Sequence, residues 1–484
     1  MVFYDRKDEL KGLDDLYARD QGILAVAYGR RGIGKTTLIQ RWITTRRHRA
    51  IFWDARPASP QQQLQSFSQA VRTFALHEGT VPSDFTYASW DDAVEELLRL
   101  ARQERLVVVL DDYDQLIASG ADLPRSLQRI WDHRLQDSQV MLFLIGSNVR
   151  VIEYDVLSYR APMYGRAWWI AHLRPFPFAH LKSRLPNYSM MDRVTLYASV
   201  GGVPRYLELL DPQLTLTQNL SRVSSSPMML EDADTTLREQ FDKPHLYAAV
   251  LGSLARGNTN SKQIAQTFGI EHRDVSRCLK MLERAKIIRW EGPVTARFPD
   301  TSRLGHYRIA DQYFLFYSRC LAPIRSLIER GQMKQALAKL RESLDEYIGA
   351  EIFPGLCREW LYRQWRRLPF HPQYVGANWG EGSQPIDIVV ISHEDHGIVF
   401  GKCNWSRHPI GADDVDALIQ QSVGVVPQPS DEWNVSYAFF SRSGFTQAAR
   451  RAIGKAKCLW VNLDDLDMGL QETSRRRGRG KSQA

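Results

Sequence analysis

The chain has 484 residues, of which 44% are hydrophobic and 24% charged, a balance that excludes a mainly disordered or fibrous protein. That length exceeds one ordinary hydrophobic core, so about three domains are expected. Five widely spaced cysteines exclude a disulfide framework, no apolar run approaches the ~20 residues that span a membrane, and the net charge of +8 alone identifies no partner. We therefore expect a cytoplasmic protein with no membrane partner.

The first predicted domain, residues 1–180, alternates short apolar runs with amphipathic stretches. Continuous apolar runs are typical of strands buried on both faces, which occur in parallel sheets flanked by helices. The sequence therefore predicts an α/β domain. The runs cover residues 23–28, 50–53, 106–110, 140–145 and 168–170.

A complete phosphate-binding loop follows the first of these runs, with the sequence Gly29-Arg-Arg-Gly-Ile-Gly-Lys35-Thr36. Glycines let such a loop wrap the phosphates, Lys35 reaches the β and γ groups, and the Thr36 hydroxyl is a ligand for Mg²⁺. The loop also opens a helix, whose N-terminus favours anions. We therefore expect ATP and Mg²⁺ to bind here. The predicted nucleotide-binding residues are Gly29, Arg31, Gly32, Gly34, Lys35, Thr36 and Thr37.

Two later runs deliver polar side chains at strand ends. The run at 106–110 ends in Asp111, predicted to hold Mg²⁺ together with Thr36, and Asp112, predicted to orient the attacking water. Asp112 stands where many ATPases carry Glu, so binding is predicted more firmly than hydrolysis. If the run at 140–145 lies between the other two strands, Ser147 or Asn148 can sense the γ-phosphate.

Arg166 is the predicted source of a further positive charge. Its guanidinium could meet the negative charge that develops during hydrolysis, within its own site or across a subunit interface. The alternative is an arginine that serves only local structure.

Residues 181–235 are predicted to form a helical lid and connector, and residues 236–320 a winged helix-turn-helix. In the second segment, two helices joined by a Gly-containing turn precede short strands at 287–290 and 306–309. Arg273, Arg277 and Lys280 suit the phosphates of duplex DNA, whereas nearby acids oppose that role. DNA contact and a purely mechanical relay both remain open.

A helical linker, residues 321–345, leads to a third predicted α/β domain at 346–470. It begins with a helix over 347–363, and strands follow at 386–391, 397–401 and 435–440. The last segment, 471–484, is a basic tail that suits nucleic acid, or is simply solvated.

The motifs together resemble the archaeal-type ATPases of the STAND branch of AAA-related ATPases. The resemblance covers nearly the whole chain, and it implies that Pro204 packs near the adenine and reports the nucleotide state. Its motifs are Phe3-Tyr-Asp-Arg6-Lys-Asp-Glu9-Leu, Tyr28-Gly-Arg-Arg, the strand-end acids, Gly146-Ser147, Tyr164-Gly-Arg166 and Gly201-Gly-Val-Pro204-Arg-Tyr-Leu.

Residues 346–470 resemble a restriction-endonuclease-like, PD-(D/E)XK domain. Asp387 is retained, but Lys402 and Asn404 stand where that family typically carries Glu and Lys, and Pro354 stands at the position of the first acid. One carboxylate beside a lysine makes a poor Mg²⁺ site. The resemblance therefore implies a nuclease fold without activity, retained for binding or assembly.

The leading hypothesis is a nucleotide switch in which ATP binding and slow hydrolysis control contact with DNA or a protein partner, self-association included. One alternative is an ATP-gated nuclease, which needs a further acid near Asp387. The other is a DNA-binding regulator whose ATP site is only structural.

Overall fold

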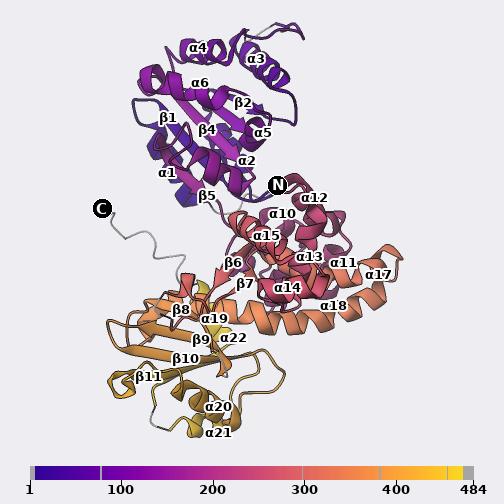
Figure 1. The fold of residues 1–484 in the computed structure, drawn as a ribbon, viewed down its shortest axis with the longest axis vertical. Coiled ribbons are helices and arrows are strands. Elements are labelled where there is room, and N and C mark those ends of the chain that lie inside the picture. The colour runs from indigo at the N-terminus through magenta and orange to yellow at the C-terminus, as the bar shows by residue number, and fades with distance from the viewer. Residues whose placement is uncertain (1–5, 77–78, 297, 381–382, 455, 472–484) are drawn as a thin grey trace. The chain divides into compact units, whose positions relative to one another are not determined.

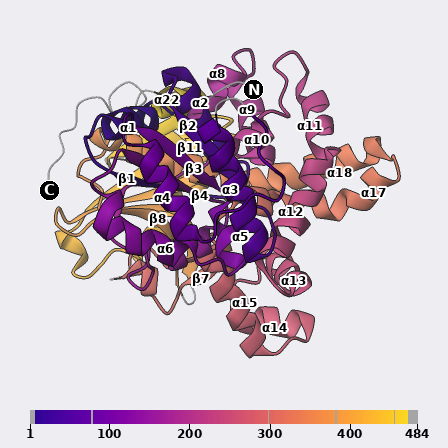
Figure 2. The ribbon, with the colours of Figure 1, turned by 90° about the horizontal axis from the view of Figure 1, so that it is seen from above.

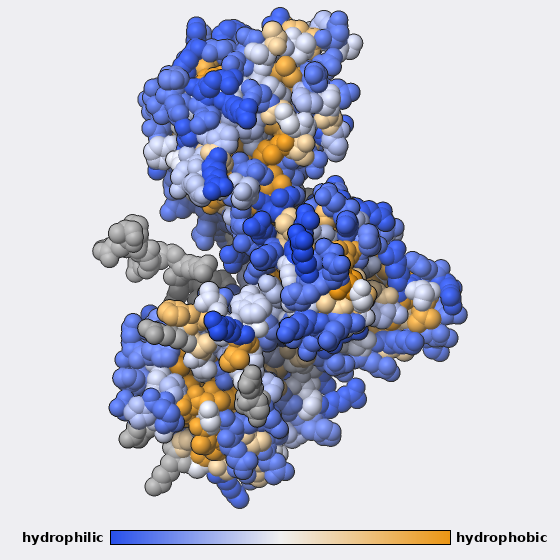
Figure 3. Space-filling view, viewed as in Figure 1, coloured by the Kyte–Doolittle hydropathy of each residue, from blue (hydrophilic) through white to orange (hydrophobic). Residues whose placement is uncertain are grey.

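A computed structural model describes residues 6–76, 79–296, 298–380, 383–454 and 456–471. Apart from Gln471, the predicted basic tail lies outside these residues. Among them, no helix has the length and the apolar character needed to cross a membrane. Most of the surface on the face drawn in Figure 3 is hydrophilic. The chain divides into two compact units, residues 1–175 with 203–205, and residues 176–202 with 206–484.

The first unit contains a five-stranded sheet in the order β2-β3-β4-β1-β5, and every pair of neighbouring strands is parallel. The predicted parallel sheet is therefore confirmed, with β4 between β3 and β1. Its elements are α1 (Lys7–Tyr17), β1 (Ile23–Tyr28), α2 (Lys35–Arg46), β2 (Ala50–Asp54), α3 (Pro60–Leu76), α4 (Trp90–Leu100), β3 (Leu106–Asp111), α5 (Tyr113–Ala118), α6 (Leu123–Ile130), η1 (Trp131–Leu135), β4 (Val140–Gly146), α7 (Val149–Val151), η2 (Ile152–Val156) and β5 (Ala167–His172).

Helices cover both faces of this sheet (Figure 1). On one face, Phe67 of α3, Leu97 of α4 and Leu127 of α6 join a single core with the strands. On the other face, the ring of Trp42 in α2 packs 5.8 Å from that of Phe143 in β4. Strands β1, β3 and β4 are buried at every residue. Their continuous apolar sequences suit this position, because helices pack on both faces of the sheet.

The outermost strand β5 corrects one expectation. Its apolar run was expected to be buried on both faces, but Trp168 and Ile170 are 49% and 52% exposed. The reason is position: β5 lies at the edge of the sheet and pairs only with β1, so its side chains alternate between more and less exposed. A run of apolar letters does not distinguish an edge strand from a central one.

The second unit is mainly helical in its first half and contains two further sheets. Helix α10 straddles the boundary, since Pro204 and Arg205 belong to the first unit. Its elements are η3 (Phe178–His180), α8 (Leu181–Arg184), α9 (Met190–Val200), α10 (Pro204–Leu207), α11 (Leu216–Ser224), α12 (Pro227–Gln240), α13 (Pro244–Ala255), α14 (Ser261–Phe268), α15 (His272–Arg284), β6 (Ile288–Glu291), η4 (Pro299–Thr301), β7 (His306–Ile309), α16 (Gln312–Phe316), η5 (Tyr317–Leu321), η6 (Ala322–Ile324), α17 (Arg325–Glu329), α18 (Met333–Tyr347), η7 (Ile348–Ile352), α19 (Phe353–Arg363), η8 (Trp365–Arg367), β8 (Tyr374–Gly380), β9 (Ser383–Ser392), β10 (Gly397–Asn404), α20 (Ala412–Val423), η9 (Ser430–Glu432), β11 (Asn434–Ser441), α21 (Gln447–Ala452), β12 (Cys458–Asn462) and α22 (Leu463–Gln471).

Helices α13, α14 and α15 are followed by an antiparallel hairpin, β6–β7. Asn260 caps the start of α14, and Gly269 ends it in a left-handed conformation with φ 62°. Val275 and Leu279 of α15 are buried, whereas Arg273, Arg277 and Lys280 are exposed. The two helices, the turn and the two strands therefore lie where the sequence predicted them.

A second five-stranded sheet, ordered β12-β11-β10-β9-β8, lies in the C-terminal part of the second unit. Strands β8, β9 and β10 are antiparallel, and β10, β11 and β12 are parallel. Val415 of α20 and Ala449 of α21 join its core, and Trp360 of α19 packs edge-on against Phe440. Helix α18 lies beside α11 and α17 (Figure 2). The sequence predicted β9, β10 and β11 but missed the edge strands β8 and β12.

A buried ion pair ties the last helix to the start of the second unit. The guanidinium of Arg193 in α9 donates to both carboxylate oxygens of Asp467 in α22, at 2.9 and 2.8 Å, and Lys182 lies 3.3 Å from the same carboxylate. Burial works against ionisation of Asp467, but the hydrogen bonds from Arg193 outweigh it and lower the pKa. Segments 274 residues apart therefore share one core.

We expect Arg193→Ala to destabilise the second unit by roughly 3–5 kcal/mol, because it leaves a buried carboxylate without its partner. Urea denaturation of the purified protein measures this. The matched control is Arg222→Ala, which removes an exposed arginine 3.7 Å from Asp211 and should cost less than about 1 kcal/mol. Equal losses from both variants would contradict the assignment.

Candidate nucleotide-binding site

The loop between β1 and α2 has the backbone of a phosphate cradle. Gly32 and Gly34 have φ values of 78° and 90°, in the left-handed region that residues with a Cβ avoid. Gly34 also forms the N-cap of α2 and has no side chain to cap the helix. The start of α2 is therefore not capped by a side chain of Gly34, and the N-terminus of a helix favours anions.

Lys35 is buried beneath this loop, with only 5% of its surface exposed. Its ammonium donates to the carbonyl oxygens of Gly29 at 2.8 Å and Arg30 at 3.2 Å, and to Ser147 Oγ at 3.0 Å. Burial lowers the pKa of Lys35 to about 8, although nearby aspartates, Asp112 first, favour the charged form. An anion placed at this ammonium would restore its full charge.

Thr36 and Asp111 form the pair that would hold Mg²⁺. The Thr36 hydroxyl donates to Asp111 Oδ2 at 2.7 Å, and Asp111 Oδ1 accepts the N–H of Asp112 at 3.0 Å. Burial raises the pKa of Asp111, although the hydrogen bond from Thr36 opposes the shift. Among the described residues, no group of three or more His, Cys, Asp or Glu side chains could hold a metal. A Mg²⁺ ion at this pair would complete its coordination with phosphate oxygens and water.

Ser147 links the lysine to the acids, because β4 ends between β1 and β3. Its hydroxyl accepts from Lys35 and donates to Asp112 Oδ1 at 3.3 Å. Its own N–H donates to Asp114 Oδ1 at 2.9 Å. Asp114 is buried, burial raises its pKa, and the sequence analysis missed it. The signal available was a third acid directly after the tandem pair.

Two predicted residues lie away from this cluster or are engaged elsewhere. The Asn148 side chain accepts the N–H of Val151 at 3.3 Å and so caps the short helix α7. Arg166 precedes β5, at the amino edge of the parallel sheet, whereas the loop lies at the carboxyl edge. Its guanidinium donates to both carboxylate oxygens of Asp132 and to the carbonyl of Pro162. The structure thus does not bring Arg166 to the site of its own chain.

Three residues from a later part of the chain, Val203–Arg205, belong to the first unit and lie against the loop. The N–H of Arg205 donates to the carbonyl of Gly32 at 3.3 Å. A Cβ added to Gly32 would lie 2.9 Å from Arg205 Cβ, and one on Gly34 would lie 3.8 Å from Pro204 Cγ. The segment that carries Pro204 therefore packs directly on the phosphate loop.

Comparisons with known proteins support the same assignment. Residues 3–210 match a family described as an ATPase domain predominantly from Archaea, and residues 317–416 match a family of archaeal and bacterial proteins of unknown function. An uncharacterized protein of Methanocaldococcus jannaschii is 27% identical over 408 residues, which are 84% of this chain and 88% of the relative.

Solved structures with related folds share little sequence with the chain. Cdc6p from Pyrobaculum aerophilum is 15% identical and covers 68% of this chain and 95% of its own, with a TM-score of 0.33. The Drosophila ORC bound to DNA is 13% identical and covers 66% of this chain and 87% of its own, with a TM-score of 0.33. The Thermotoga maritima RuvB Holliday junction branch migration motor is 15% identical and covers 64% of this chain and 93% of its own, with a TM-score of 0.32. TM-scores this low say nothing about the activity of this chain.

The parallel sheet, the phosphate loop with its lysine and the family match define residues 3–210 as an ATP-binding P-loop ATPase domain. Within it, the structure brings Lys35, Thr36, Asp111, Asp112 and Ser147 together. The site so formed can hold a triphosphate and one hard cation, and it presents a carboxylate beside them.

We expect Mg-ATP binding to take up protons at alkaline pH. With a Lys35 pKa of about 8, roughly half of the side chain is neutral at pH 8, and bound phosphates favour the ammonium. Uptake should be near zero at pH 6.5 and close to ~0.5 proton at pH 8, and it should increase toward pH 9. Titration calorimetry in buffers of different ionisation enthalpy measures it. Lys35→Arg, which stays charged, should bind without uptake, and an unchanged proton linkage in that variant would exclude Lys35 as its source.

Proposed function

We propose that this chain is an ATP-operated switch: Mg-ATP binding and hydrolysis in the first unit change the second unit's affinity for DNA or a protein partner. The observation that carries the proposal is the packing of Val203–Arg205 on the phosphate loop. These residues are joined covalently to α9 on one side and to the rest of α10 on the other, both in the second unit. A nucleotide that shifts the loop therefore shifts the anchor of those helices.

The catalytic roles follow from positioning, since phosphoryl transfer depends on placement and electrostatics. Bound Mg²⁺ would neutralise charge on the phosphates. Lys35 and the N–H groups at the start of α2 bind the phosphates, while Thr36 and Asp111 hold the metal. Asp112, at the end of β3, orients the attacking water, and Ser147 keeps its carboxylate in register with Lys35.

We expect Lys35→Ala to weaken Mg-ATP binding at least about tenfold, because it removes a charged donor to phosphate. Asp112→Asn should still bind, but hydrolysis should fall at least about a hundredfold, since the amide cannot act as a base. Titration calorimetry and single-turnover hydrolysis distinguish the two. Hydrolysis unchanged in Asp112→Asn would assign the water to another group.

The switch itself is tested by hydrogen–deuterium exchange of peptides from residues 190–207. Mg-ATP should slow their exchange in the wild-type protein and in Asp112→Asn, but not in Lys35→Ala. If wild-type exchange stays constant although calorimetry shows binding, the ATP site is structural and the switch is wrong.

For the second unit, the order of α13–α15 and the β6–β7 hairpin supports a winged helix-turn-helix that contacts duplex DNA. Helix α15 exposes Arg273, Arg277 and Lys280 while it buries its apolar side. Lysine and arginine on one helix face suit phosphate contact. The exposed Asp274 opposes such contact, so the affinity should be modest and weakly dependent on sequence.

We expect the triple variant Arg273→Ala, Arg277→Ala, Lys280→Ala to weaken DNA binding uniformly across sequences and to reduce the salt slope by about 3. Fluorescence anisotropy with labelled duplexes at several salt concentrations measures both quantities. Arg238→Ala, an exposed arginine of α12, is the control. If the triple variant binds as the wild type does, α15 acts as a relay rather than as a contact.

The C-terminal sheet supports a role in binding or assembly rather than in strand cleavage. Lys402 forms an ion pair with Asp414 at 3.0 Å, and Asp387 accepts the N–H of Cys403 at 2.8 Å. Burial raises the pKa of Asp387, which disfavours the carboxylate that a metal requires. Among the residues described, Asp387 belongs to no group of three or more His, Cys, Asp or Glu side chains that could hold a metal.

A further inference from the structure

The second unit holds a cavity of about 880 Å³ between the β6–β7 hairpin and the helices that precede the C-terminal sheet. This volume falls within the usual range for small-molecule sites. Four arginines from four different parts of the unit line it: Arg256, which follows α13, Arg308 of β7, Arg319 of η5 and Arg358 of α19. None of them belongs to the nucleotide-binding site described above.

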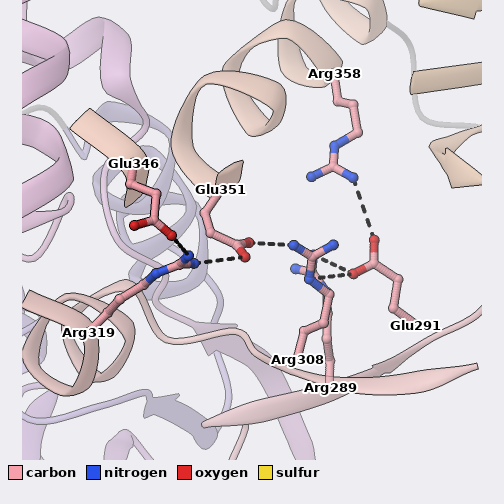
Figure 4. A network of polar contacts seen from close by, with 7 residues as sticks. All are labelled: Arg289, Glu291, Arg308, Arg319, Glu346, Glu351 and Arg358. Carbon is pink, nitrogen blue, oxygen red and sulfur yellow. Dashed lines mark hydrogen bonds and ion pairs between the residues drawn. The ribbon is translucent and has the colours of Figure 1, made fainter. Parts of the chain in front are cut away.

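Three of these guanidiniums take part in one polar network (Figure 4). Glu351 bridges Arg308 at 2.5 Å and Arg319 at 3.6 Å. Glu291 lies 3.6 Å from Arg308, 3.5 Å from Arg358 and 3.3 Å from Arg289. The two carboxylates therefore stand where the oxygens of a bound anion would stand, between guanidiniums that come from separate elements.

Charge in the network is not balanced. Among the ion pairs of the described residues, the network joins four guanidiniums to three carboxylates, those of Glu291, Glu346 and Glu351. The cavity lining also includes one further arginine, Arg256, and one further carboxylate, Asp387, so the formal surplus of one positive charge is unchanged. Burial works against ionisation of Glu291, but the surrounding arginines outweigh it and lower the pKa, so the local potential is positive.

One carboxylate of the network is easily displaced. Glu346 pairs only with Arg319 among the ion pairs of the described residues, at 2.9 Å, and its side chain is 76% exposed. An ion pair of this kind contributes little stability. The Arg319 side chain, by contrast, is 23% exposed. An anion that enters the cavity can therefore replace Glu346 as its partner at a small cost in free energy.

Aromatic side chains in the cavity offer a binding surface for the base of a nucleotide. His306, Tyr307 and Trp379 line the same cavity, and the rings of His306 and Trp379 lie 4.2 Å apart. Burial, followed by the charge of Arg308, lowers the pKa of His306, which keeps that ring neutral. Such rings offer flat surfaces on which a base can stack.

From these features we infer that the cavity is a second binding site, for a nucleoside 5′-phosphate, with Arg308, Arg319 and Arg358 on the phosphate and the His306 and Trp379 rings beside the base. The chemistry is shared by a free nucleoside monophosphate and by the 5′-phosphorylated end of a strand. The site is independent of the ATP switch, since every residue in it belongs to the second unit.

The test uses the full chain carrying Lys35→Ala, so that the first site does not contribute. Titration calorimetry compares five probes: AMP, adenosine, inorganic phosphate, a 5′-phosphorylated hexanucleotide and its 5′-hydroxyl counterpart. We expect AMP or the phosphorylated strand to bind, and adenosine and the hydroxyl strand to bind at least about tenfold more weakly. Binding of AMP alone identifies a free nucleotide as the ligand, and binding of the strand alone identifies a nucleic-acid end.

Two substitutions should act in opposite directions in that background. Glu346→Gln frees Arg319 and should strengthen binding by about two- to fivefold, whereas Arg319→Gln should weaken it at least about tenfold. Glu342→Gln, the same change at an exposed position of α18 outside the cavity, should leave it unchanged. Circular dichroism checks that Arg319→Gln folds.

Three results would overturn the proposal. They are binding of neither AMP nor the 5′-phosphorylated strand, binding of the phosphorylated ligand no tighter than that of its unphosphorylated counterpart or of inorganic phosphate, and weaker binding in Glu346→Gln. The exposed position of Glu346 makes that variant informative even if Arg319→Gln fails to fold.

Discussion

The nucleotide site depends on a buried ammonium. Withdrawing a charge from water is costly unless partners replace the lost hydration, and Lys35 has three such partners: two loop carbonyls and Ser147 Oγ. Those acceptors hold the loop in its wrapped conformation, with its positive-φ glycines, before any ligand arrives. The lowered pKa of Lys35 shows that the compensation is incomplete, so an anionic ligand gains from completing it.

Strand order is what lets one lysine organise the rest. Because β4 lies between β1 and β3, the residue after β4 falls between the loop and the two acids. The Ser147 hydroxyl accepts a hydrogen bond from Lys35 and donates one to Asp112, and the backbone N–H of Ser147 donates to Asp114. The same crowded edge admits Val203–Arg205, whose approach requires a glycine at position 32. The phosphate loop therefore contacts both Ser147, which bonds to Asp112, and the segment that leads to the second unit.

The sequence predicted those parts of the fold and site that depend on local patterns. Uniform apolar runs identified the buried strands, and the loop, Asp111, Asp112 and Ser147 follow from what stands at a strand's end. Spacing along the chain does not reveal which edge of a sheet a residue occupies, so the sequence did not show that Arg166 pairs with Asp132 away from the site of its own chain; a role of Arg166 across a subunit interface stays a prediction. The Arg193–Asp467 pair could not be found at all, since its partners are 274 residues apart and neither lies in a recognisable motif.

The two units constrain different elements in different ways. In the first, the three-residue segment Val203–Arg205 is joined covalently to residues of the second unit on both sides. In the second, the β6–β7 hairpin is held by charge, since Glu291 and Arg308 pair with residues of η7 and α19. Partly buried pairs gain strength from the lower local dielectric, yet each is lost entirely if one member changes partner. An anion that occupied the cavity would therefore compete for the same guanidiniums that hold the hairpin, and would couple the hairpin's freedom to a ligand other than the nucleotide at Lys35.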